Sequence, residues 1–178
     1  GRFLPETYAF VRGDSDFDLL RRARTAMKKT LADAWGRRSP DLPLASADEA
    51  LILASIVEKE TGRSEERPAI AGVFARRLKL GMLLQTDPTV IYGLGDSFDG
   101  NLRRADLDAD TPYNTYRRPG LPPTPIALPG RAAIEAATHP AGGNTLYFVA
   151  RGDGSHEFSD SLEAHNRAVA KYQLRRRR

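Results

Sequence analysis

Apolar residues recur at helical spacing between residues 46 and 61, which read SADEALILASIVEKET. Ser46, followed three residues later by Glu49, matches a capping box at the start of a helix, and Gly62 is a suitable stop after its end. Steps of three and four residues place one set of apolar side chains on a single face: Ala50, Leu53, Ala54 and Val57. Glu60 continues this stripe, so we expect its carboxyl group at the edge of the core.

This position predicts an unusual carboxyl group at Glu60. Burial disfavours a charged carboxylate, and the partial negative charge at a helix C-terminus disfavours it further, so both effects raise the pKa. A raised pKa suits a general acid. The alternative is that Glu60 lies in solvent or pairs with a nearby arginine. Glu58 is two residues away and should point elsewhere, so we expect it to be an ordinary surface charge of the helix.

The rest of the pattern predicts further helices and one β-hairpin. A short helix should begin with Asp87 as its N-cap and Pro88 at its first position. We expect longer helices at residues 15–35, 64–80, 131–138 and 160–172. We expect strands at residues 7–11, 145–150 and 156–159, the last two joined by the turn RGDGS. These elements predict an α+β fold, in which helices pack on a small, mostly antiparallel sheet and a cleft lies beside the Glu60 helix.

Residues 93–130 form the least regular region of the sequence. Eight glycines and prolines fall between residues 110 and 130, and a loop of this length in a compact domain is usually functional or disordered. The region carries Tyr113, Asn114 and Tyr116. Aromatic rings beside amides can hold sugars by stacking and directed hydrogen bonds, but they are equally common in plain turns. Both interpretations remain open on these residues alone.

The length of 178 residues suits one domain with a real core. We expect an N-terminal part at residues 1–45, with a polar connector at 36–45, then the main domain at 46–174 and a basic tail at 175–178. No stretch approaches the ~20 apolar residues that a membrane span needs. The chain starts with Gly1 rather than Met, so we expect a fragment of a longer protein.

Composition and charge exclude several function classes. The absence of cysteine excludes disulfides, thiol nucleophiles and thiolate metal sites. The formal net charge of +4 equals the charge of the four terminal arginines, so the remainder is formally neutral. We therefore expect a neutral domain with a solvated tail, rather than a nucleic-acid-binding surface.

By elimination, the candidate catalytic group is a carboxylic acid. The sequence contains no Walker loop, dinucleotide fingerprint or nucleophile elbow. His139, His156 and His165 are too far apart for a local metal-binding pattern, and the five lysines fall on polar faces where a Schiff-base lysine would not lie. We therefore expect a carboxylic acid catalyst with no metal and no cofactor.

Several motifs match those of one known family: EKET, QTDPTVIYG, TPYNTYRRPGLPP and GSHEFSDSLEAHN. Their combination is highly specific, and the resemblance extends over roughly residues 1–172. On these residues the chain resembles the YceG-like family, whose characterised members are MltG-type endolytic murein transglycosylases. The resemblance implies cleavage of the β-1,4 bond between MurNAc and GlcNAc in peptidoglycan glycan strands, which leaves 1,6-anhydroMurNAc ends.

The resemblance also implies roles for particular residues. The family's catalytic glutamate maps onto Glu60, as a single acid/base at the end of a buried helix, and Thr61 matches the hydroxyl residue that often follows such a glutamate. Substrate-binding or cleft-floor roles are implied for eight further residues: Gln85, Asp87, Thr89, Tyr92, Tyr113, Asn114, Tyr116 and Glu157. Thr124 and Leu128 depart from the commoner Gly and Asn, so we expect different substrate contacts at that edge of the loop.

The resemblance implies peptidoglycan glycan strands as the substrate and cell-wall synthases as candidate partners. It implies a place at the extracytoplasmic, periplasmic face of the cytoplasmic membrane, with a membrane anchor missing from this soluble fragment. One alternative is a noncatalytic peptidoglycan-binding or scaffold module, which would keep the tyrosine-rich loop without needing Glu60. A lyase of chorismate-type metabolites would need a compact basic pocket, and nucleic-acid binding through residues 175–178 would be lost with that tail and depend on salt.

Overall fold

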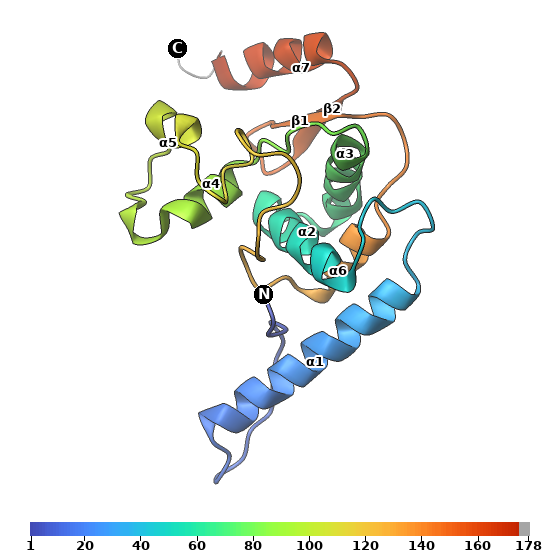
Figure 1. Ribbon diagram of the computed structural model, residues 1–178, viewed down its shortest axis with the longest axis vertical. Coiled ribbons are helices and arrows are strands. Elements are labelled where there is room, and N and C mark those ends of the chain that lie inside the picture. The colour runs from blue at the N-terminus through green and yellow to red at the C-terminus, as the bar shows by residue number, and fades with distance from the viewer. Residues whose placement is uncertain (175–178) are drawn as a thin grey trace.

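The computed structural model describes residues 1–174 and has the α+β fold that the sequence predicts (Figure 1). The helices are α1 (Asp16–Gly36), α2 (Ala47–Glu60), α3 (Arg67–Lys79), α4 (Asp87–Leu94), α5 (Arg104–Asp108), α6 (Arg131–Thr138) and α7 (Leu162–Val169). Short helical turns cover Ser64–Glu66, Gly95–Ser97 and Ala170–Leu174. The strands β1 (Tyr147–Ala150) and β2 (His156–Ser159) form one antiparallel sheet. Within this part of the chain no helix is long and apolar enough to cross a membrane. The predicted arginine tail lies outside the described residues.

α2 lies in the core and packs against both α3 and α6, which also contact each other (Figure 1). Its predicted apolar stripe is buried, and Leu51 and Ile56 are buried as well, so the helix is apolar on more than one face. The start is capped as predicted, because the Ser46 hydroxyl accepts a hydrogen bond from the Glu49 N–H at 3.2 Å. The helix ends at Glu60 and delivers that side chain to the edge of the core.

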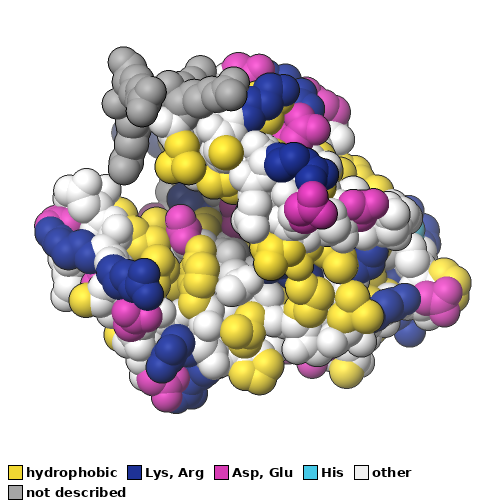
Figure 2. All heavy atoms as spheres, turned by 90° about the horizontal axis from the view of Figure 1, so that it is seen from above, with side chains coloured by type: hydrophobic (Ala, Val, Ile, Leu, Met, Phe, Trp, Pro, Cys, Tyr) yellow, Lys and Arg dark blue, Asp and Glu magenta, His cyan; other side chains and the backbone are white. Residues whose placement is uncertain are grey.

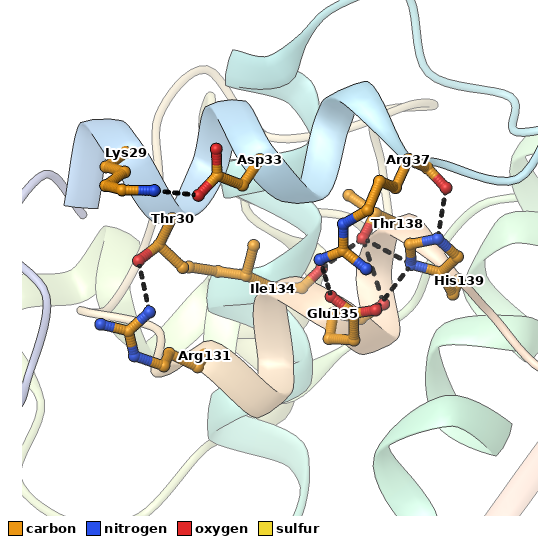
Figure 3. A network of polar contacts seen from close by, with 9 residues as sticks. All are labelled: Lys29, Thr30, Asp33, Arg37, Arg131, Ile134, Glu135, Thr138 and His139. Atoms are coloured by element: carbon orange, nitrogen blue, oxygen red, sulfur yellow. Dashed lines mark hydrogen bonds and ion pairs between the residues drawn. The ribbon is translucent and has the colours of Figure 1, made fainter. Parts of the chain in front are cut away.

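Polar contacts hold α1 along α6 (Figure 3). At the start of α6, the Arg131 guanidinium donates to the Thr30 hydroxyl at 3.0 Å. At its end, Arg37 pairs with Glu135 at 3.4 Å, and the His139 ring contacts the Arg37 carbonyl. On the apolar side, α1 contributes to the same core as α2 through three buried residues: Met27, Leu31 and Ala34. α1 is therefore part of the packed core.

The β-hairpin forms where the sequence predicts it, and it packs against both α3 and α7 (Figure 1). Phe148 pairs with Phe158 across the hairpin, and the Phe148 ring meets Phe74 of α3 edge-on, with centroids 5.7 Å apart. Alternation along β2 sends neighbouring side chains to opposite faces, so His156 and Glu157 lie on different sides of the sheet. This separation decides which of the two reaches the candidate site.

The predicted strand at residues 7–11 is wrong: this segment is irregular. Phe10 and Val11 are exposed, at 70% each, and the described part of the chain has no strand beside them to complete a ladder of hydrogen bonds. Instead the Arg22 guanidinium of α1 donates to the Ala9 carbonyl at 2.7 Å, so the segment is held by a helix side chain. A β-prone run without a partner strand does not form a strand.

The region 93–130 contains more helix than predicted. α4 continues to Leu94, a helical turn follows, and α5 is a five-residue helix whose start is capped by Asp106, which accepts from the Arg103 N–H at 2.7 Å. The predicted N-cap of α4 is also wrong, because Thr86 occupies that position and Asp87 is the first helical residue. The cause of this shift is a contact of Asp87 with the long loop, which belongs to the site.

Candidate active site

An open cleft of about 450 Å³ lies beside the C-terminal end of α2. Figure 2 views this surface from above and shows a hollow in it. On the left of the picture the hollow is bordered by the lobe that carries α4 and α5, and it is also bordered by the side chains around α7. The start of α4, the loop around Tyr116, β1 and α7 supply its walls. Glu60 lines this cleft, so the end of the central helix opens onto a solvent-accessible surface.

Glu60 is partly buried, and its carboxyl group has a raised pKa of about 7. Burial is the largest cause, since it disfavours the charged carboxylate, and the nearby charge of Asp87 acts in the same direction. A hydrogen bond from the Thr86 hydroxyl to Glu60 Oε1 and the proximity of His156 lower the pKa in part. At neutral pH a substantial fraction of this group is therefore protonated and available as an acid.

Thr86 is held in place by the two threonines beneath it. Its backbone N–H donates to the Thr115 hydroxyl at 3.1 Å, and its carbonyl accepts from the Thr89 hydroxyl at 2.8 Å. The hydroxyls of Thr89 and Thr115 lie 2.9 Å apart. All three residues are almost fully buried, so the QTDPT and YNTY motifs meet in a dry network that aims Thr86 at Glu60.

Gln85, which precedes Thr86, has a backbone φ of +52°, in the left-handed region that a residue with a side chain rarely adopts. Such a conformation costs of order 1–3 kcal/mol and persists only where the surroundings enforce it. Here the Gln85 N–H donates to the Thr115 carbonyl at 3.0 Å, and Arg77 holds the carbonyls of Leu83 and Leu84. This strained turn aims the polar group of Thr86 at the end of α2.

Asp87 faces the cleft instead of capping α4. The Tyr116 hydroxyl donates to Asp87 Oδ1 at 2.5 Å, and Tyr116 is itself partly buried at the cleft wall. Burial and this contact with a carboxylate both raise the pKa of Tyr116, so its hydroxyl stays protonated as a donor. The pair joins the long loop to the start of α4 at the edge of the cleft.

Glu58 has a structural position. Its carboxylate pairs with Arg67 of α3 at 3.4 Å and accepts from the Gly130 N–H, just before α6, at 2.9 Å. We predicted a plain surface charge, but the group is half-buried and ties three helices together. It does not line the cleft that contains Glu60.

His156 lines the cleft and is oriented by a carboxylate. Glu66 accepts from the His156 backbone N–H at 2.9 Å and lies 2.7 Å from ring atom Nδ1. The contact with His156 lowers the pKa of Glu66, so this carboxylate stays charged at neutral pH. The Nδ1–H donates to Glu66, which leaves Nε2 as the ring nitrogen available to the cleft.

The structure brings together four of the ten residues that we predicted for the site: Glu60, Gln85, Asp87 and Tyr116. Three others are buried supports: Thr61 accepts from the Arg63 N–H, Thr89 holds Thr86, and Asn114 donates to the carbonyls of residues 106, 107 and 109. The rings of Tyr92 and Tyr113 contact each other, with centroids 5.0 Å apart, and neither residue lines the cleft. Glu157 pairs with Arg151 at 2.6 Å on the other side of the sheet.

Sequence reasoning left seven polar or aromatic cleft residues out of the predicted site: Arg77, Thr86, Tyr147, Phe148, His156, His165 and Gln173. Thr86 lies inside the QTDPT motif, so its motif position was a usable signal. Arg77 resembles any other arginine of an amphipathic helix, and only the fold reveals that it is buried. Within residues 1–174, no group of three or more histidine, aspartate or glutamate side chains is placed to hold a metal ion.

A partly buried glutamic acid with a pKa near neutrality, in an open cleft lined by aromatic and polar side chains, is an arrangement typical of sites that use a carboxylic acid catalyst. The model of the YceG-like family matches residues 1–171. The chain belongs to the YceG-like family.

Named relatives support this assignment. The chain is 38% identical to an endolytic murein transglycosylase of Bacillus subtilis over 172 residues, which are 97% of this chain and 47% of the relative. It is 34% identical to the endolytic murein transglycosylase of Streptococcus pneumoniae, over 97% of this chain and 32% of the relative. A crystal structure of a YceG-like protein from Listeria monocytogenes superposes with a TM-score of 0.81 at 37% identity, over 94% of this chain and 54% of that one. The chain thus spans about half or less of the length of these relatives.

Proposed function

We propose that this chain is the catalytic region of an endolytic murein transglycosylase. It cleaves the β-1,4 bond between MurNAc and GlcNAc within a peptidoglycan strand and leaves a 1,6-anhydroMurNAc end. The observation that carries the proposal is Glu60, a partly buried carboxyl group with a pKa of about 7 that lines an open cleft. The names of the relatives support the substrate, and the domain from residue 46 to 174 contains every residue of the cleft.

The reaction needs one acid/base group. Protonated Glu60 donates its proton to the glycosidic oxygen, and the bond between that oxygen and C1 of MurNAc breaks. The C6 hydroxyl of the same sugar attacks C1, and its proton passes to the Glu60 carboxylate. The new C1–O6 bond closes the anhydro ring, Glu60 regains its proton, and no water is consumed.

The surroundings of Glu60 suit both halves of this cycle. Burial keeps enough of the group protonated to donate, and the Thr86 hydrogen bond to Oε1 stabilises the carboxylate that follows. Because Oε1 accepts from Thr86, the transferable proton resides on Oε2. Glycosidases usually need a second carboxylate as nucleophile or base, but here the sugar supplies the nucleophile. Asp87, which also lines the cleft, is engaged by Tyr116.

The other predicted residues take three kinds of role in this proposal. Gln85, Asp87 and Tyr116 line the cleft and contact the sugar directly. Thr61, Thr89 and Asn114 are buried and hold the cleft walls in place. The rings of Tyr92 and Tyr113 lie farther out, where Tyr92 is 45% exposed and offers a surface on which a longer glycan can stack.

The substrate sets where the protein works. Peptidoglycan lies outside the cytoplasm, so we propose an extracytoplasmic location, at the outer face of the cytoplasmic membrane. An anchor in the remaining part of the full-length protein would hold it there, and cell-wall synthases would be its neighbours.

Digestion of purified glycan strands tests the proposal. Wild type and Glu60→Gln are incubated with the strands, and the products are identified by mass spectrometry. Wild type should release anhydro ends, and Glu60→Gln should release none above background, because glutamine cannot donate a proton. Glu163→Gln is the matched control, since Glu163 is exposed and pairs only with Arg167 among the described residues.

Other products would contradict the proposal in distinct ways. Reducing ends in place of anhydro ends would indicate hydrolysis by water, which requires a second catalytic carboxylate. Anhydro ends from Glu60→Gln would remove Glu60 from the mechanism. Strands that are bound but cut by neither protein would indicate a noncatalytic glycan-binding module.

A further inference from the structure

Arg77 is a buried cation in the wall of the cleft. Its side chain comes from α3, is 7% exposed and lines the same cleft as Glu60. Nε donates to the Leu146 carbonyl at 2.7 Å, and Nη1 donates to the carbonyls of Leu83 and Leu84 at 3.1 and 2.9 Å and to Gln85 Oε1 at 3.4 Å. These contacts fix the plane of the guanidinium, so the group is rigid before any ligand arrives.

The charge of this guanidinium has no counter-ion among residues 1–174. No carboxylate of the described chain lies within ion-pair distance, and Nη2 makes no hydrogen bond to it, although the other two nitrogens are engaged. The group stays protonated at neutral pH despite its burial. Buried charges are normally paired, because an unpaired one loses its hydration without compensation. A rigid, unpaired arginine in a cleft wall is therefore suited to bind an anion.

A second polar side chain lies nearby. His165 of α7 also lines the cleft, and its Nδ1 is buried without a hydrogen-bond partner in the described chain. Arg77 and His165 both lie against the ring of Tyr147: the guanidinium carbon is 5.1 Å from the ring centroid and the imidazole centroid is 5.2 Å from it. An arginine without a counter-ion in the described chain and a histidine with one unpartnered ring nitrogen thus meet at one aromatic ring.

We propose that Arg77 and His165 form a carboxylate-binding subsite beside the catalytic acid. A carboxylate placed against Tyr147 would accept from Arg77 Nη2 and from a ring N–H of His165, which gives the guanidinium a counter-ion. This inference rests on the proposed function and extends it, because MurNAc carries a lactyl group that ends in a carboxylate when no peptide is attached. A peptide stem converts that group to an amide but supplies a carboxylate at its own end. Both sources present the same chemistry.

The planar fork of arginine distinguishes a carboxylate from a neutral amide. A charge-assisted hydrogen bond is about twice as strong as a neutral one, so replacing the carboxylate by an amide should weaken binding about tenfold. The preference should also decrease as salt increases, because ions screen the attraction in an open cleft.

Calorimetric binding to Glu60→Gln, which leaves the ligand intact, tests the subsite. Three MurNAc–GlcNAc tetrasaccharides are compared: one with free lactyl carboxylates, one with those groups as neutral methylamides, and one with peptide stems that end in a carboxylate. The subsite predicts about tenfold tighter binding of at least one carboxylate ligand than of the methylamide. Tighter binding of the first ligand identifies the lactyl group as the source, and tighter binding of only the third identifies the stem.

Variants in the same background assign the preference to the two residues. Arg77→Met and His165→Phe should each reduce the carboxylate preference several-fold, and His165→Phe keeps an aromatic ring against Tyr147. Arg76→Met is the matched control. Arg76 also donates to backbone carbonyls, of Thr145 and Ala141, but faces away from this cleft, so the ratio of affinities should not change.

The outcomes separate the subsite from the proposed function. Equal affinity for all three ligands overturns the subsite and leaves the cleavage reaction untouched. A preference that persists in His165→Phe also overturns the assignment, even if Arg77→Met does not fold. The absence of binding to any of the ligands would contradict the proposed function as well.

Discussion

At the scale of single residues, the proposed reaction depends on two opposing influences on one carboxyl group. Burial raises the pKa of Glu60 to about 7, and the Thr86 hydrogen bond limits that rise. Without burial, the carboxyl group of Glu60 would be almost fully ionised at neutral pH and could not donate a proton. A group without the hydrogen bond would hold its proton more tightly and its carboxylate would be less stable. Thr86 is therefore a positioning residue whose effect can be measured.

Thr86→Val tests this balance. The hydrogen bond favours the charged form of Glu60, so its removal raises the pKa of Glu60 further. The rate of strand cleavage falls as pH rises through this pKa, because the protonated fraction decreases, so the falling limb of the pH–rate profile should move to higher pH. The maximal rate should also decrease, roughly tenfold, because the carboxyl group is less well oriented. The measurement is the pH dependence of anhydro-end release.

Thr25→Val is the matched control, because Thr25 is exposed on α1 and, within residues 1–174, its hydroxyl bonds only to the Arg21 carbonyl. Its profile should coincide with that of wild type. A falling limb of Thr86→Val that stays in place, or that moves to lower pH, would show that this hydrogen bond does not stabilise the Glu60 carboxylate.

At the scale of elements, the sequence predicts well whatever is encoded locally. The ends of α2, α6 and β2 follow from a cap, a periodic stripe or a turn contained in the element itself. The strand at residues 7–11 fails because a strand requires a partner that no local pattern encodes. α5 is missed because five residues are too few to carry a periodic signal, and Asp87 is misassigned because Tyr116, 29 residues later, binds its carboxylate.

The same distinction explains which site residues the sequence predicts. Glu60 is identifiable from the stripe of its own helix, and the motifs include Gln85, Asp87 and Tyr116. Arg77 and Tyr147 reach the cleft only after α3 and β1 have packed together, through the contact of Phe74 with Phe148. Asn114 carries an amide typical of sugar contacts, yet tertiary packing places it at 0% exposure, where it organises the loop.

Glu58 of α2 supports a prediction about the stability that comes from linking three helices. Glu58 links α2 to Arg67 of α3 and to the Gly130 N–H before α6. Glu58→Ala removes both contacts and should lower the free energy of unfolding by about 1–3 kcal/mol, because a half-buried donor loses its acceptor. The products of strand cleavage should remain anhydro ends. Chemical denaturation measures the first effect and mass spectrometry the second.

Glu163→Gln again serves as the control, with a change of stability of at most about 0.5 kcal/mol, because it is a surface substitution. Loss of anhydro ends in a folded Glu58→Ala protein would give Glu58 a direct part in catalysis. An unchanged free energy of unfolding would show that the link between the three helices carries no net stability.

At the scale of the whole molecule, the site depends on a core that extends well beyond the cleft. The central helix that carries Glu60 packs against α6, and α6 is fixed to α1 by contacts at both of its ends (Figure 3). α1 adds Met27, Leu31 and Ala34 to the same buried cluster. Buried residues on both sides of the division that we predicted at residue 45 share this cluster, so we expect residues 1–45 and 46–174 to unfold as one cooperative unit.

Met27→Ala tests this cooperativity. Met27 is 2% exposed, so the substitution leaves a cavity and should lower the free energy of unfolding by about 2–5 kcal/mol. The single tryptophan, Trp35, lies on α1, so its fluorescence reports that helix, whereas far-ultraviolet circular dichroism reports all helices. In one cooperative unit the fluorescence and dichroism signals change at the same denaturant concentration. This holds for wild type and for the variant, whose shared transition lies at a lower concentration.

Lys28→Ala, at an exposed position of the same helix, should leave the midpoint nearly unchanged. A fluorescence transition that precedes the dichroism transition would show that α1 unfolds separately, and cleavage activity should then survive in the interval between the two.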